Sequence, residues 1–346
     1  MKVYHKIILS LLAFLFMAGC ERDLDGLDEA TFPTTPEVFI DGFSAGLNYA
    51  AFGGSDVKAF DVDEDVAYQG TASMRIAVPD RNDPKGAYAG GVYFTSVGRD
   101  LSSYNVLTFW AKASKAANVD LIGFGNDLGE NKYQAAITNV PVNTNWQKYY
   151  IPIPDASKLT NERGMFFYSE GAEEDRGYTF WIDEVKFEDL GTVKNVRGMI
   201  QGGEDVVVSA ETGATYNITA IASANLPNGI DQQVQTAPAY FEFSSSNPAV
   251  ASVSNTGEVK VMDAGSAVIT AKLGDQEAQG SLTVNSTGAP VLPATPAPKP
   301  SQDASKVISL FSNEYTNVPV DFFNGYWQFS TTQLANIQVS GDDILR

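Results

Sequence analysis

The sequence predicts an all-β protein built from small sandwich domains. From Glu37 onward the chain is a succession of short β-type runs separated by Gly, Asn, Asp and Pro. We find no long amphipathic helix in it. Because Cys20 is the only cysteine, no intramolecular disulfide can form, and each domain must be held by its own core, by edge protection or by a bound ion.

Residues 1–19 are predicted to be a signal peptide. Their apolar run, Ile7 to Ala18, is too short for a comfortable membrane span, and a small residue stands directly before Cys20. The segment from Phe16 to Cys20 resembles the lipobox, with Met17 where leucine is usual. The resemblance implies that lipoprotein signal peptidase cuts here and that Cys20 is lipidated. An ordinary secretory peptide with an incidental cysteine is the alternative.

Removal of this segment takes Lys2 and Lys6 from the 23 basic side chains and leaves 21 against 42 acidic ones, a formal charge of −21. Nucleic acid is therefore a poor partner. Residues 20–36 are the predicted tether. In it, Glu21 to Asp25 resembles the acidic export signal of Bacteroidota surface lipoproteins, which implies a lipid-anchored position on the outer membrane, exposed at the cell surface. A merely flexible polar tether is the alternative.

The only histidine, His5, lies in the segment that is removed. Its loss excludes Ser-His-Asp and Cys-His catalysis and takes away the usual ligands of catalytic zinc. Carboxylate chemistry would need a placed pair of acids. Acidic residues such as Glu173 and Glu174 are abundant, as the charge requires, but nothing marks a pair flanked by sugar-stacking rings. The sequence therefore predicts no enzyme within these residues.

The first domain is predicted over residues 37–190, where eight β-type runs in about 150 residues fit a jelly-roll sandwich. The runs are Thr71–Val78, Gly90–Val97, Val106–Ala113, Val119–Phe124, Tyr133–Val140, Trp146–Ile153, Met165–Ser169 and Tyr178–Phe187. Four stretches of the domain resemble the galactose-binding-like jelly rolls that include carbohydrate-binding modules of families 4, 11 and 22. They are Phe39–Phe43, Ala67–Ile76, Leu107–Ala113 and Trp181–Val185.

This resemblance implies a structural calcium ion. In that family the opening acid, the Tyr-x-Gly turn and the aspartate of the last strand commonly surround the ion, and Asp41, Gly70 and Asp183 match those places. Calcium takes about six to eight hard oxygens and makes neighbouring carboxylates tolerable. We expect Asp61 and Asp63 to complete the shell. The alternative is that this acidic loop is simply solvated.

Sugar recognition uses aromatic rings that stack on pyranose faces, together with amide, carboxylate and cationic groups that pair with hydroxyls. We expect such groups to lie on one concave sheet. The candidates are Tyr88, Tyr93, Trp110, Lys132, Tyr133, Gln134, Tyr168 and Glu170. Period-2 alternation sets Trp110 on the face opposite Leu107 and Phe109, off the main core. Packing is the alternative role for each aromatic ring.

A second domain is predicted over residues 193–286, where strand spacing suits an immunoglobulin-like sandwich. Its runs are Asp205–Ser209, Thr215–Ala222, Ala239–Ser244, Ala249–Val253, Glu258–Met262 and Ser266–Leu273. The stretches Ser245–Val253, Thr256–Val259 and Gly265–Ala271 resemble the group 2 bacterial immunoglobulin-like repeat. That resemblance implies a spacer or adhesion module rather than a reaction.

Residues 287–304 contain five prolines and are predicted to form an extended polyproline spacer. Residues 305–346 look like the start of a further β-sandwich. About 40 residues are too few for a complete one, so we expect an incomplete domain that is truncated or packed on its neighbours. Its aromatic residues are Phe311, Tyr315, Phe322, Phe323, Tyr326, Trp327 and Phe329.

These features favour a non-catalytic cell-surface lipoprotein that captures polysaccharide and delivers it to uptake or degradation machinery, such as a SusD-like, TonB-dependent transporter complex. Openings similar to that of residues 305–346 occur beside family 16 glycoside hydrolases and in Bacteroidota glycan-binding lipoproteins. By this analogy, a β-glucan such as laminarin is the first guess. Two alternatives stay open: the accessory region of a family 16-like hydrolase whose catalytic domain follows Arg346, and an adhesin or structural stalk.

Overall fold

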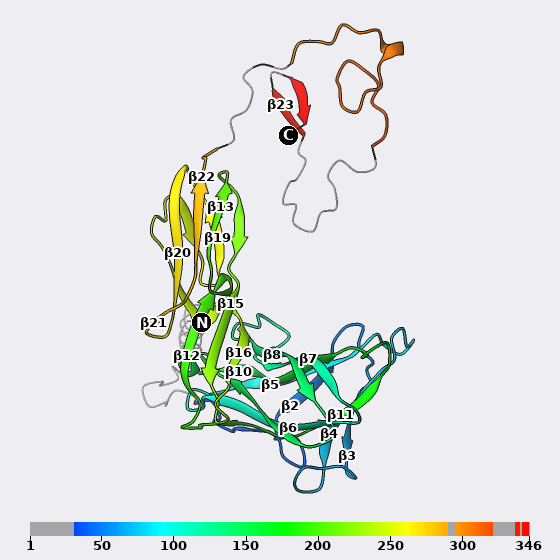
Figure 1. Ribbon diagram of the computed structural model, residues 1–346, viewed down its shortest axis with the longest axis vertical. Helices are drawn as coiled ribbons and strands as arrows, with labels where there is room; N and C mark the ends of the chain where they lie inside the picture. Colours follow the sequence, from blue (N-terminus) through cyan, green and yellow to red (C-terminus); the bar gives the residue numbers. More distant parts are fainter. Residues whose placement is uncertain (1–30, 290–294, 296, 321–335, 340, 346) are drawn as a thin grey trace, which may run out of the picture. The chain divides into compact units, whose positions relative to one another are not determined.

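The computed structural model describes residues 31–289, 295, 297–320, 336–339 and 341–345 (Figure 1). The expectations for the signal peptide, for Cys20 and for the aromatic residues from Phe322 to Phe329 lie outside these residues. The described chain forms two compact units. The first runs to Gly202 and also takes in Thr219–Glu242 and Lys272–Gln279; the second holds Gly203–Ile218, Phe243–Ala271 and the described residues from Gly280 onward.

The described residues form strands and short 3-10 turns but no α-helix, and none of their helical turns could cross a membrane. The turns are η1 (Ala156–Lys158), η2 (Gln201–Gly203), η3 (Pro238–Tyr240) and η4 (Ala304–Lys306).

The first unit is a sandwich of two antiparallel sheets. A six-stranded sheet has the order β3-β4-β11-β6-β9, with β1 paired to β11, and an eight-stranded sheet has the order β12-β15-β16-β8-β7-β10-β5-β2. The strands are β1 (Glu37–Phe39), β2 (Leu47–Ala51), β3 (Phe60–Asp63), β4 (Ser73–Val78), β5 (Ala89–Arg99), β6 (Val106–Ala113), β7 (Ala117–Phe124), β8 (Ala135–Val142), β9 (Gln147–Pro152), β10 (Glu162–Glu170), β11 (Tyr178–Glu188), β12 (Lys194–Ile200), β15 (Ala220–Asn225) and β16 (Asp231–Thr236).

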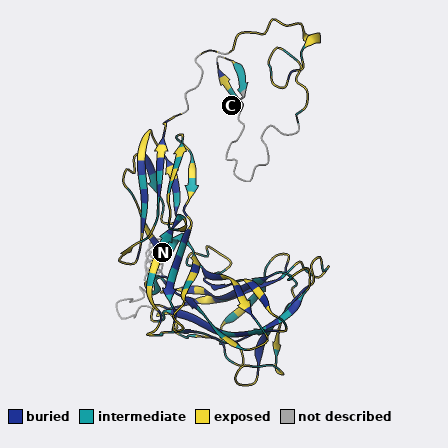
Figure 2. Ribbon diagram, in the orientation of Figure 1, coloured by how far each residue is buried: buried dark blue, intermediate teal, exposed yellow. Residues whose placement is uncertain are grey.

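Aromatic side chains fill the core between these two sheets. Phe109 of β6 lies edge-to-face with Phe166 of β10, with ring centroids 6.0 Å apart, and Phe124 of β7 meets Phe187 of β11 at 5.6 Å. All four rings are at most 1% exposed. Along most of β11, buried residues alternate with partly exposed ones, as the pleat of a strand requires. Figure 2 shows buried residues along the strands of both sheets, and the predicted jelly roll is confirmed.

Segment 219–242 extends the eight-stranded sheet. Gln235 and Thr236 of β16 lie opposite Ala136 and Ala135 of β8, and the Ala237 N–H donates to the Gln134 carbonyl at 2.8 Å. On its other side β16 pairs with β15 along its whole length. Figure 1 shows the labelled strands β12, β15, β16 and β8 following one another.

The second unit is an immunoglobulin-like sandwich, as predicted. Its sheets have the orders β13-β22-β20-β17 and β14-β19-β18. The remaining strands are β13 (Asp205–Ala210), β14 (Thr215–Asn217), β17 (Phe241–Ser245), β18 (Ala251–Val253), β19 (Glu258–Val261), β20 (Gly265–Leu273), β21 (Gln276–Glu277), β22 (Ser281–Ser286), β23 (Asn336–Val339) and β24 (Asp342–Leu345). Val259 and Ile269 are fully buried in its core.

Two predicted runs differ from the observed strands. Thr215–Ala222 is not one strand: it breaks into β14, which pairs with β19, and β15, which pairs with β12 and β16. The run at Ala239–Ser244 begins as a 3-10 turn because Pro238 starts a helical turn there, and β17 follows from Phe241.

Candidate functional site

A continuous row of residues crosses the outer face of the eight-stranded sheet, the face turned away from the core. Phe166 and Phe124 point into the core, so their neighbours Phe167 and Gly123 point outward. Residues opposite one another in paired strands share a face. The register therefore places on this outer face Ala50, Val92, Phe167, Gly123, Ala136 and Gln235, in that order across β2, β5, β10, β7, β8 and β16.

An apolar cluster lies in the middle of this row. Val92, Ala136 and Phe167 are its buried members, and the partly buried residues packed against them are Ala50, Phe52, Phe94 and Leu121. Gly123 makes room for the Phe167 ring: a Cβ at this position would lie 2.6 Å from the ring and 2.4 Å from the Ala135 carbonyl oxygen. We call the three buried and four partly buried residues of this cluster, without Gly123, the outer-face cluster.

Tyr88 extends the cluster with a polar ring. A Cβ on Gly90 would lie 2.5 Å from the Tyr88 ring and 3.1 Å from the Phe52 ring, so both rings lie close over this glycine. The Tyr88 hydroxyl donates to the Gly53 carbonyl at 3.1 Å, which fixes the ring's orientation. Gly90 pairs with Ser169, two residues along β10 from Phe167, so the rings belong to the same outer face.

A polar hollow of about 280 Å³ adjoins the cluster. Leu121 and Ala136 belong to both. The lining is Leu121, Asn131, Gln134, Ala136, Gln235, Thr236 and Ala237. Three of these side chains are carboxamides, which both donate and accept hydrogen bonds. The face thus combines flat apolar rings with amides, and it carries no carboxylate among the residues of the cluster and the hollow.

Of the predicted sugar-binding residues, Tyr88 and Gln134 lie on this face, whereas Tyr93 and Tyr168 point into the core. Tyr93 is 1% exposed and stacks on Phe43 at 4.7 Å between ring centroids. Tyr168 is fully buried, with its hydroxyl 3.2 Å from that of Tyr49. Burial raises the pKa of both phenols. Because side chains alternate along a strand, the outer places on β5 and β10 belong to their neighbours Val92, Phe94 and Phe167.

Trp110 lies on the other sheet. Its ring stacks on Tyr68, with 3.7 Å between centroids and 13° between planes, so one ring face is covered. Lys112 lies over the rings of Trp146 and Trp181, at 5.9 and 5.6 Å. The expectation that Trp110 shares one sheet with the other candidates is therefore not met, because β6 belongs to the six-stranded sheet.

Lys132 and Tyr133 lie in the turn just before β8 and line a second hollow, of about 510 Å³. The Lys132 ammonium stands 5.2 Å from the centre of the Tyr133 ring, which packs against Tyr240 at 5.3 Å. Glu162, not singled out from the sequence, lines the same hollow; burial raises its pKa to about 7, although the N–H groups of Arg163 and Gly164 donate to it.

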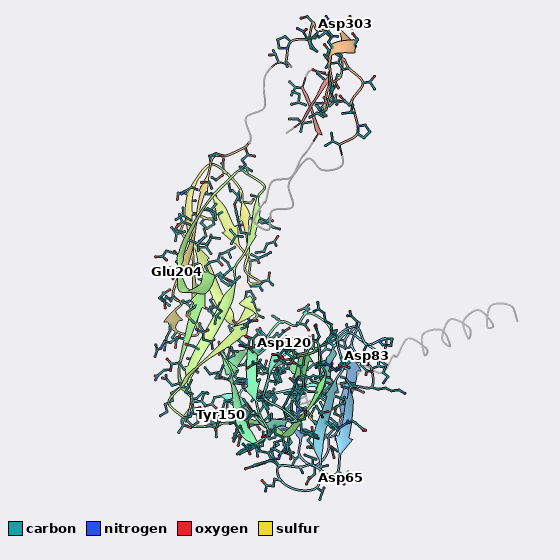
Figure 3. All side chains as sticks on the ribbon, turned by 45° about the vertical axis from the view of Figure 1, so that its right-hand side comes forward. Asp65, Asp83, Asp120, Tyr150, Glu204 and Asp303 are labelled. Atoms are coloured by element: carbon teal, nitrogen blue, oxygen red, sulfur yellow. The ribbon has the colours of Figure 1, made fainter. Side chains whose placement is uncertain are left out.

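Glu170 is 2% exposed and belongs to the rim of the core rather than to the open face. Its carboxylate accepts from the Asp120 N–H at 2.6 Å and from the Tyr178 hydroxyl at 2.9 Å. Figure 3 labels Asp120 among the closely packed side chains of this unit. Burial raises the pKa of Glu170 to about 7.

Asp41 and Asp183, two of the expected calcium ligands, converge on one turn. Asp41 accepts from the N–H groups of Thr71 and Ala72, the second at 3.0 Å, and Asp183 accepts from the Tyr68 N–H at 2.8 Å. Gly70 is in this turn with φ +74°, and a Cβ on it would collide with the Asp41 carboxylate. The expected Asp41, Gly70 and Asp183 thus lie together.

The carboxylates of Asp61 and Asp63, the other two expected calcium ligands, accept hydrogen bonds from other groups than this turn. Asp63 accepts from the Trp181 indole at 2.8 Å and from the N–H groups of Asp65 and Val66, while Asp61 accepts from the Val62 N–H. Within the described part of the chain, no group of three or more acidic, histidine or cysteine side chains is close enough to hold a metal ion. A calcium shell would therefore need oxygens from the backbone and from water beside Asp41 and Asp183.

Comparison with known proteins finds two family matches in the chain. Residues 40–189 match the family model of carbohydrate binding domain 30. Residues 207–284 match the model of the bacterial Ig-like domain, group 2. The chain thus carries a jelly roll like that of carbohydrate-binding modules, followed by a group 2 immunoglobulin-like domain. We call residues 40–189 the module. No curated protein matches the chain.

The solved structures similar to the chain include two carbohydrate-binding modules and an adhesin domain. The crystal structure of a family 30 carbohydrate binding module is 20% identical, covers 49% of this chain and 91% of that chain, and has a TM-score of 0.31. A family 11 module from Clostridium thermocellum, in complex with a β-1,3-1,4-mixed-linked tetrasaccharide, is 15% identical over 46% and 98% of the two chains, with a TM-score of 0.33. The K1 cleaved adhesin domain of Lys-gingipain from Porphyromonas gingivalis W83 is 15% identical over 45% and 97%, with a TM-score of 0.30.

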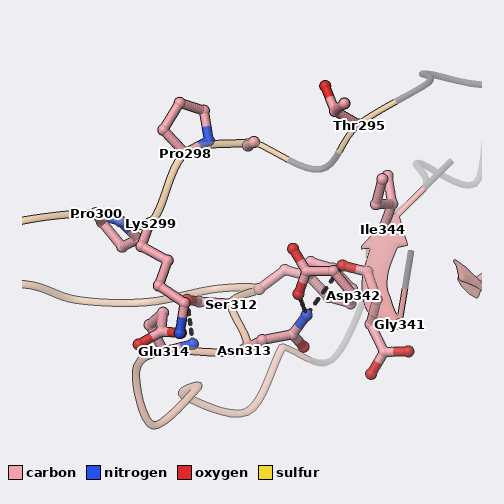
Figure 4. A pocket seen from close by; sticks show the side chains of 13 residues that line it. Thr295, Pro298, Lys299, Pro300, Ser312, Asn313, Glu314, Gly341, Asp342 and Ile344 are labelled. Atoms are coloured by element: carbon pink, nitrogen blue, oxygen red, sulfur yellow. Dashed lines mark hydrogen bonds and ion pairs between the residues drawn. The ribbon is translucent and has the colours of Figure 1, made fainter. Parts of the chain in front are cut away.

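A larger hollow lies outside the module. It measures about 940 Å³ and is lined by Thr295 and by residues from Ala297 to Pro300, from Phe311 to Glu314 and from Gly341 to Ile344. Figure 4 shows its walls joined by a Lys299–Glu314 ion pair and by a hydrogen bond from Asn313 to Asp342. Lys299 and Glu314 are 82% and 39% exposed, so solvent screens their attraction.

Proposed function

We propose that the outer face of the eight-stranded sheet binds polysaccharide without cleaving it. One observation carries the proposal: within a carbohydrate-binding-type jelly roll, the register lines up an aromatic cluster and a carboxamide hollow on one face. Flat rings can stack on the apolar faces of sugars while amides pair with the hydroxyls. The half-buried rings of Phe52 and Phe94, with Tyr88, are the proposed stacking surfaces.

The arrangement supports binding rather than hydrolysis. Glycoside hydrolysis needs a pair of carboxyl groups on either side of the scissile bond. Glu170, the nearest acid on β10, is buried and bound by a backbone N–H and a phenol. The residues of the outer-face cluster and the hollow include neither aspartate nor glutamate.

For the chain as a whole, the proposed role is that of a lipoprotein anchored through Cys20 on the outer membrane. It would capture a β-glucan such as laminarin and pass it to a SusD-like, TonB-dependent transporter or to a hydrolase. The support is the lipobox-like segment from Phe16 to Cys20, together with the carbohydrate-binding and immunoglobulin-like domains.

Affinity electrophoresis of the soluble chain from residue 21 onward tests the binding proposal. Gels containing laminarin, mixed-linkage β-glucan, xylan, alginate or starch should show retardation in at least one, and Phe94→Ala should remove it. Tyr68→Ala is the matched control, because Tyr68 is an exposed ring in the turn between β3 and β4, where it stacks on Trp110 of the six-stranded sheet. Retardation lost in Tyr68→Ala but kept in Phe94→Ala would move the site to the other sheet, and no retardation in any gel would refute glycan binding.

We also propose that a structural calcium ion joins the turn at Tyr68–Ala72, supported by the convergence of Asp41 and Asp183 there. A cation would offset the two negative charges. Millimolar calcium should then raise the midpoint of thermal unfolding, a chelator should reverse the rise, and Asp41→Asn should reduce it. Asp61→Asn, on neighbouring β3, is the control. Equal midpoints with calcium and with chelator would refute the ion.

A further inference from the structure

We infer that the ligand-binding face does not end with the module: β16, from the segment that follows it, completes the face and supplies Gln235 as a residue that determines ligand affinity and specificity. The inference rests on the proposed function and extends it. Residues 231–236 lie outside the 40–189 match and inside the 207–284 match, yet they form an interior strand of the same sheet as the module.

The backbone holds β16 firmly in place. It pairs with β8 on one side and with β15 on the other, where the register runs from Ala220 opposite Thr236 to Asn225 opposite Asp231. Beyond its end, Tyr240 is fully buried, and its hydroxyl donates to the Tyr133 carbonyl at 2.7 Å. A strand bonded on both edges and followed by a buried anchor is a rigid support for binding groups.

Alternation along β16 sends its glutamines to opposite faces. Val234 is fully buried, so Gln233 and Gln235 project to the outer face, where both are exposed. Gln235 lies opposite Ala136 of the outer-face cluster. Gln232 has the parity of Val234, and its side-chain amide donates to the Gln233 carbonyl at 2.9 Å.

Gln235 is free to bind a ligand. Its carboxamide lines the 280 Å³ hollow beside Gln134, and among the described residues neither side-chain amide has a hydrogen-bond partner. A carboxamide offers two donor hydrogens and an acceptor oxygen, the set that pairs with neighbouring hydroxyls of a sugar. The chemistry favours a neutral, hydroxyl-rich glycan, because the residues lining the hollow carry no charge.

The row from Ala50 on β2 to Gln235 on β16 spans six adjacent strands. At about 4.8 Å between strands it measures roughly 24 Å. Phe94 lies near one end of it, on β5, and Gln235 lies at the other end. A glycan chain laid across the strands would therefore stack on the rings first and reach Gln235 with sugars farther along.

Isothermal titration of the soluble chain from residue 21 onward with laminarin tests this inference. Removing one neutral hydrogen-bonding group should weaken binding about threefold to tenfold, so Gln235→Ala should do so while Gln232→Ala has no effect. Gln232 is the matched control, because it is a glutamine on the same strand whose side chain lies on the opposite face from that of Gln235. Thermal unfolding of both variants should match that of the parent chain, because Gln235 is exposed.

The outcomes separate the inference from the proposed function. If Phe94→Ala weakens binding and Gln235→Ala does not, the extended face is refuted while glycan binding stands. If Gln232→Ala and Gln235→Ala weaken binding equally, the effect does not come from the outer face and the inference also fails. If the parent chain binds none of laminarin, mixed-linkage β-glucan, xylan, alginate and starch, both proposals fall together.

Discussion

Single residues on β5 and β10 decide which rings face the ligand. The stretch from Gly90 to Phe94 carries apolar or aromatic side chains on both faces of its strand, and the stretch from Met165 to Tyr168 does the same. Both strands have one core-facing side and one side covered by the outer-face cluster. The sequence could therefore predict these strands, but it could not tell which of two neighbouring side chains points into the core. For this reason Tyr93 and Tyr168 became candidates for sugar binding in place of Phe94 and Phe167.

Tyr93 gives a direct test of this assignment. Its hydroxyl is buried and has no hydrogen-bond partner among the described residues, so Tyr93→Phe removes an unsatisfied polar group without leaving a cavity. We expect unfolding free energy to stay level or rise by about 1 kcal/mol, and glycan affinity to stay unchanged. Urea titration and calorimetric binding measure the two. A loss of affinity would return Tyr93 to the ligand site.

Glu170 makes stability depend on pH. Burial raises its pKa in the folded protein to about 7, above the ordinary value of the unfolded chain. Between those two pKa values, Glu170 is protonated in the folded protein and ionised in the unfolded chain. The contribution of Glu170 to the free energy of unfolding is therefore full at low pH and is lost as pH rises through about 7. Each unit of pKa shift corresponds to about 1.4 kcal/mol.

Urea unfolding of Glu170→Gln at pH 5 and pH 8 measures this contribution. The parent chain should lose more stability than the variant over that interval, because the amide cannot titrate. Glu162, whose pKa is also raised to about 7, contributes in the same direction and remains in both proteins. Equal losses in parent and variant would show that Glu170 titrates at its ordinary value.

At the scale of elements, strands with clear alternation were predictable and those without it were not. β6 has the predicted bounds, Val106–Ala113, because its residues alternate between the core and the opposite face. β16 reads Asp-Gln-Gln-Val-Gln-Thr, and Val234 is its only fully buried residue. Its place follows from pairing with β8, about a hundred residues earlier, which no local pattern reveals.

Tyr240, the buried residue that follows β16, can be tested by removing its hydroxyl oxygen alone. Tyr240→Phe removes the hydroxyl that donates to the Tyr133 carbonyl, so the free energy of unfolding should fall by about 1 kcal/mol. Hydrogen exchange of the Ala237 amide, bonded to Gln134, should quicken. Tyr133→Phe is the control, since its hydroxyl makes no hydrogen bond among the described residues. Unchanged exchange in Tyr240→Phe would mean that other contacts hold the strand.

At the scale of the molecule, the succession of a jelly roll and an immunoglobulin-like sandwich was predictable because each domain has its own strand spacing and family-like stretches. What the sequence did not reveal is how far the first unit reaches. Val193, Ala224 and Leu226 pack on Val106 of the jelly roll and are at most 7% exposed. These contacts join residues beyond 190 to the core of the first unit.

A chain ending at residue 190 should therefore be less stable and bind more weakly than one ending at residue 290. It would expose the β8 edge at Ala135 and Ala136 and the apolar surface of Val106, and it would lack Gln235. Both chains, started at residue 31, contain the same tryptophans, Trp110, Trp146 and Trp181, all in the module, so indole fluorescence reports on the jelly roll alone. Its unfolding midpoint should drop by about 5 °C or more in the shorter chain. If the two chains have equal unfolding midpoints but unequal glycan affinities, β16 contributes to binding only. If both the midpoints and the affinities are equal, the module is complete without β16.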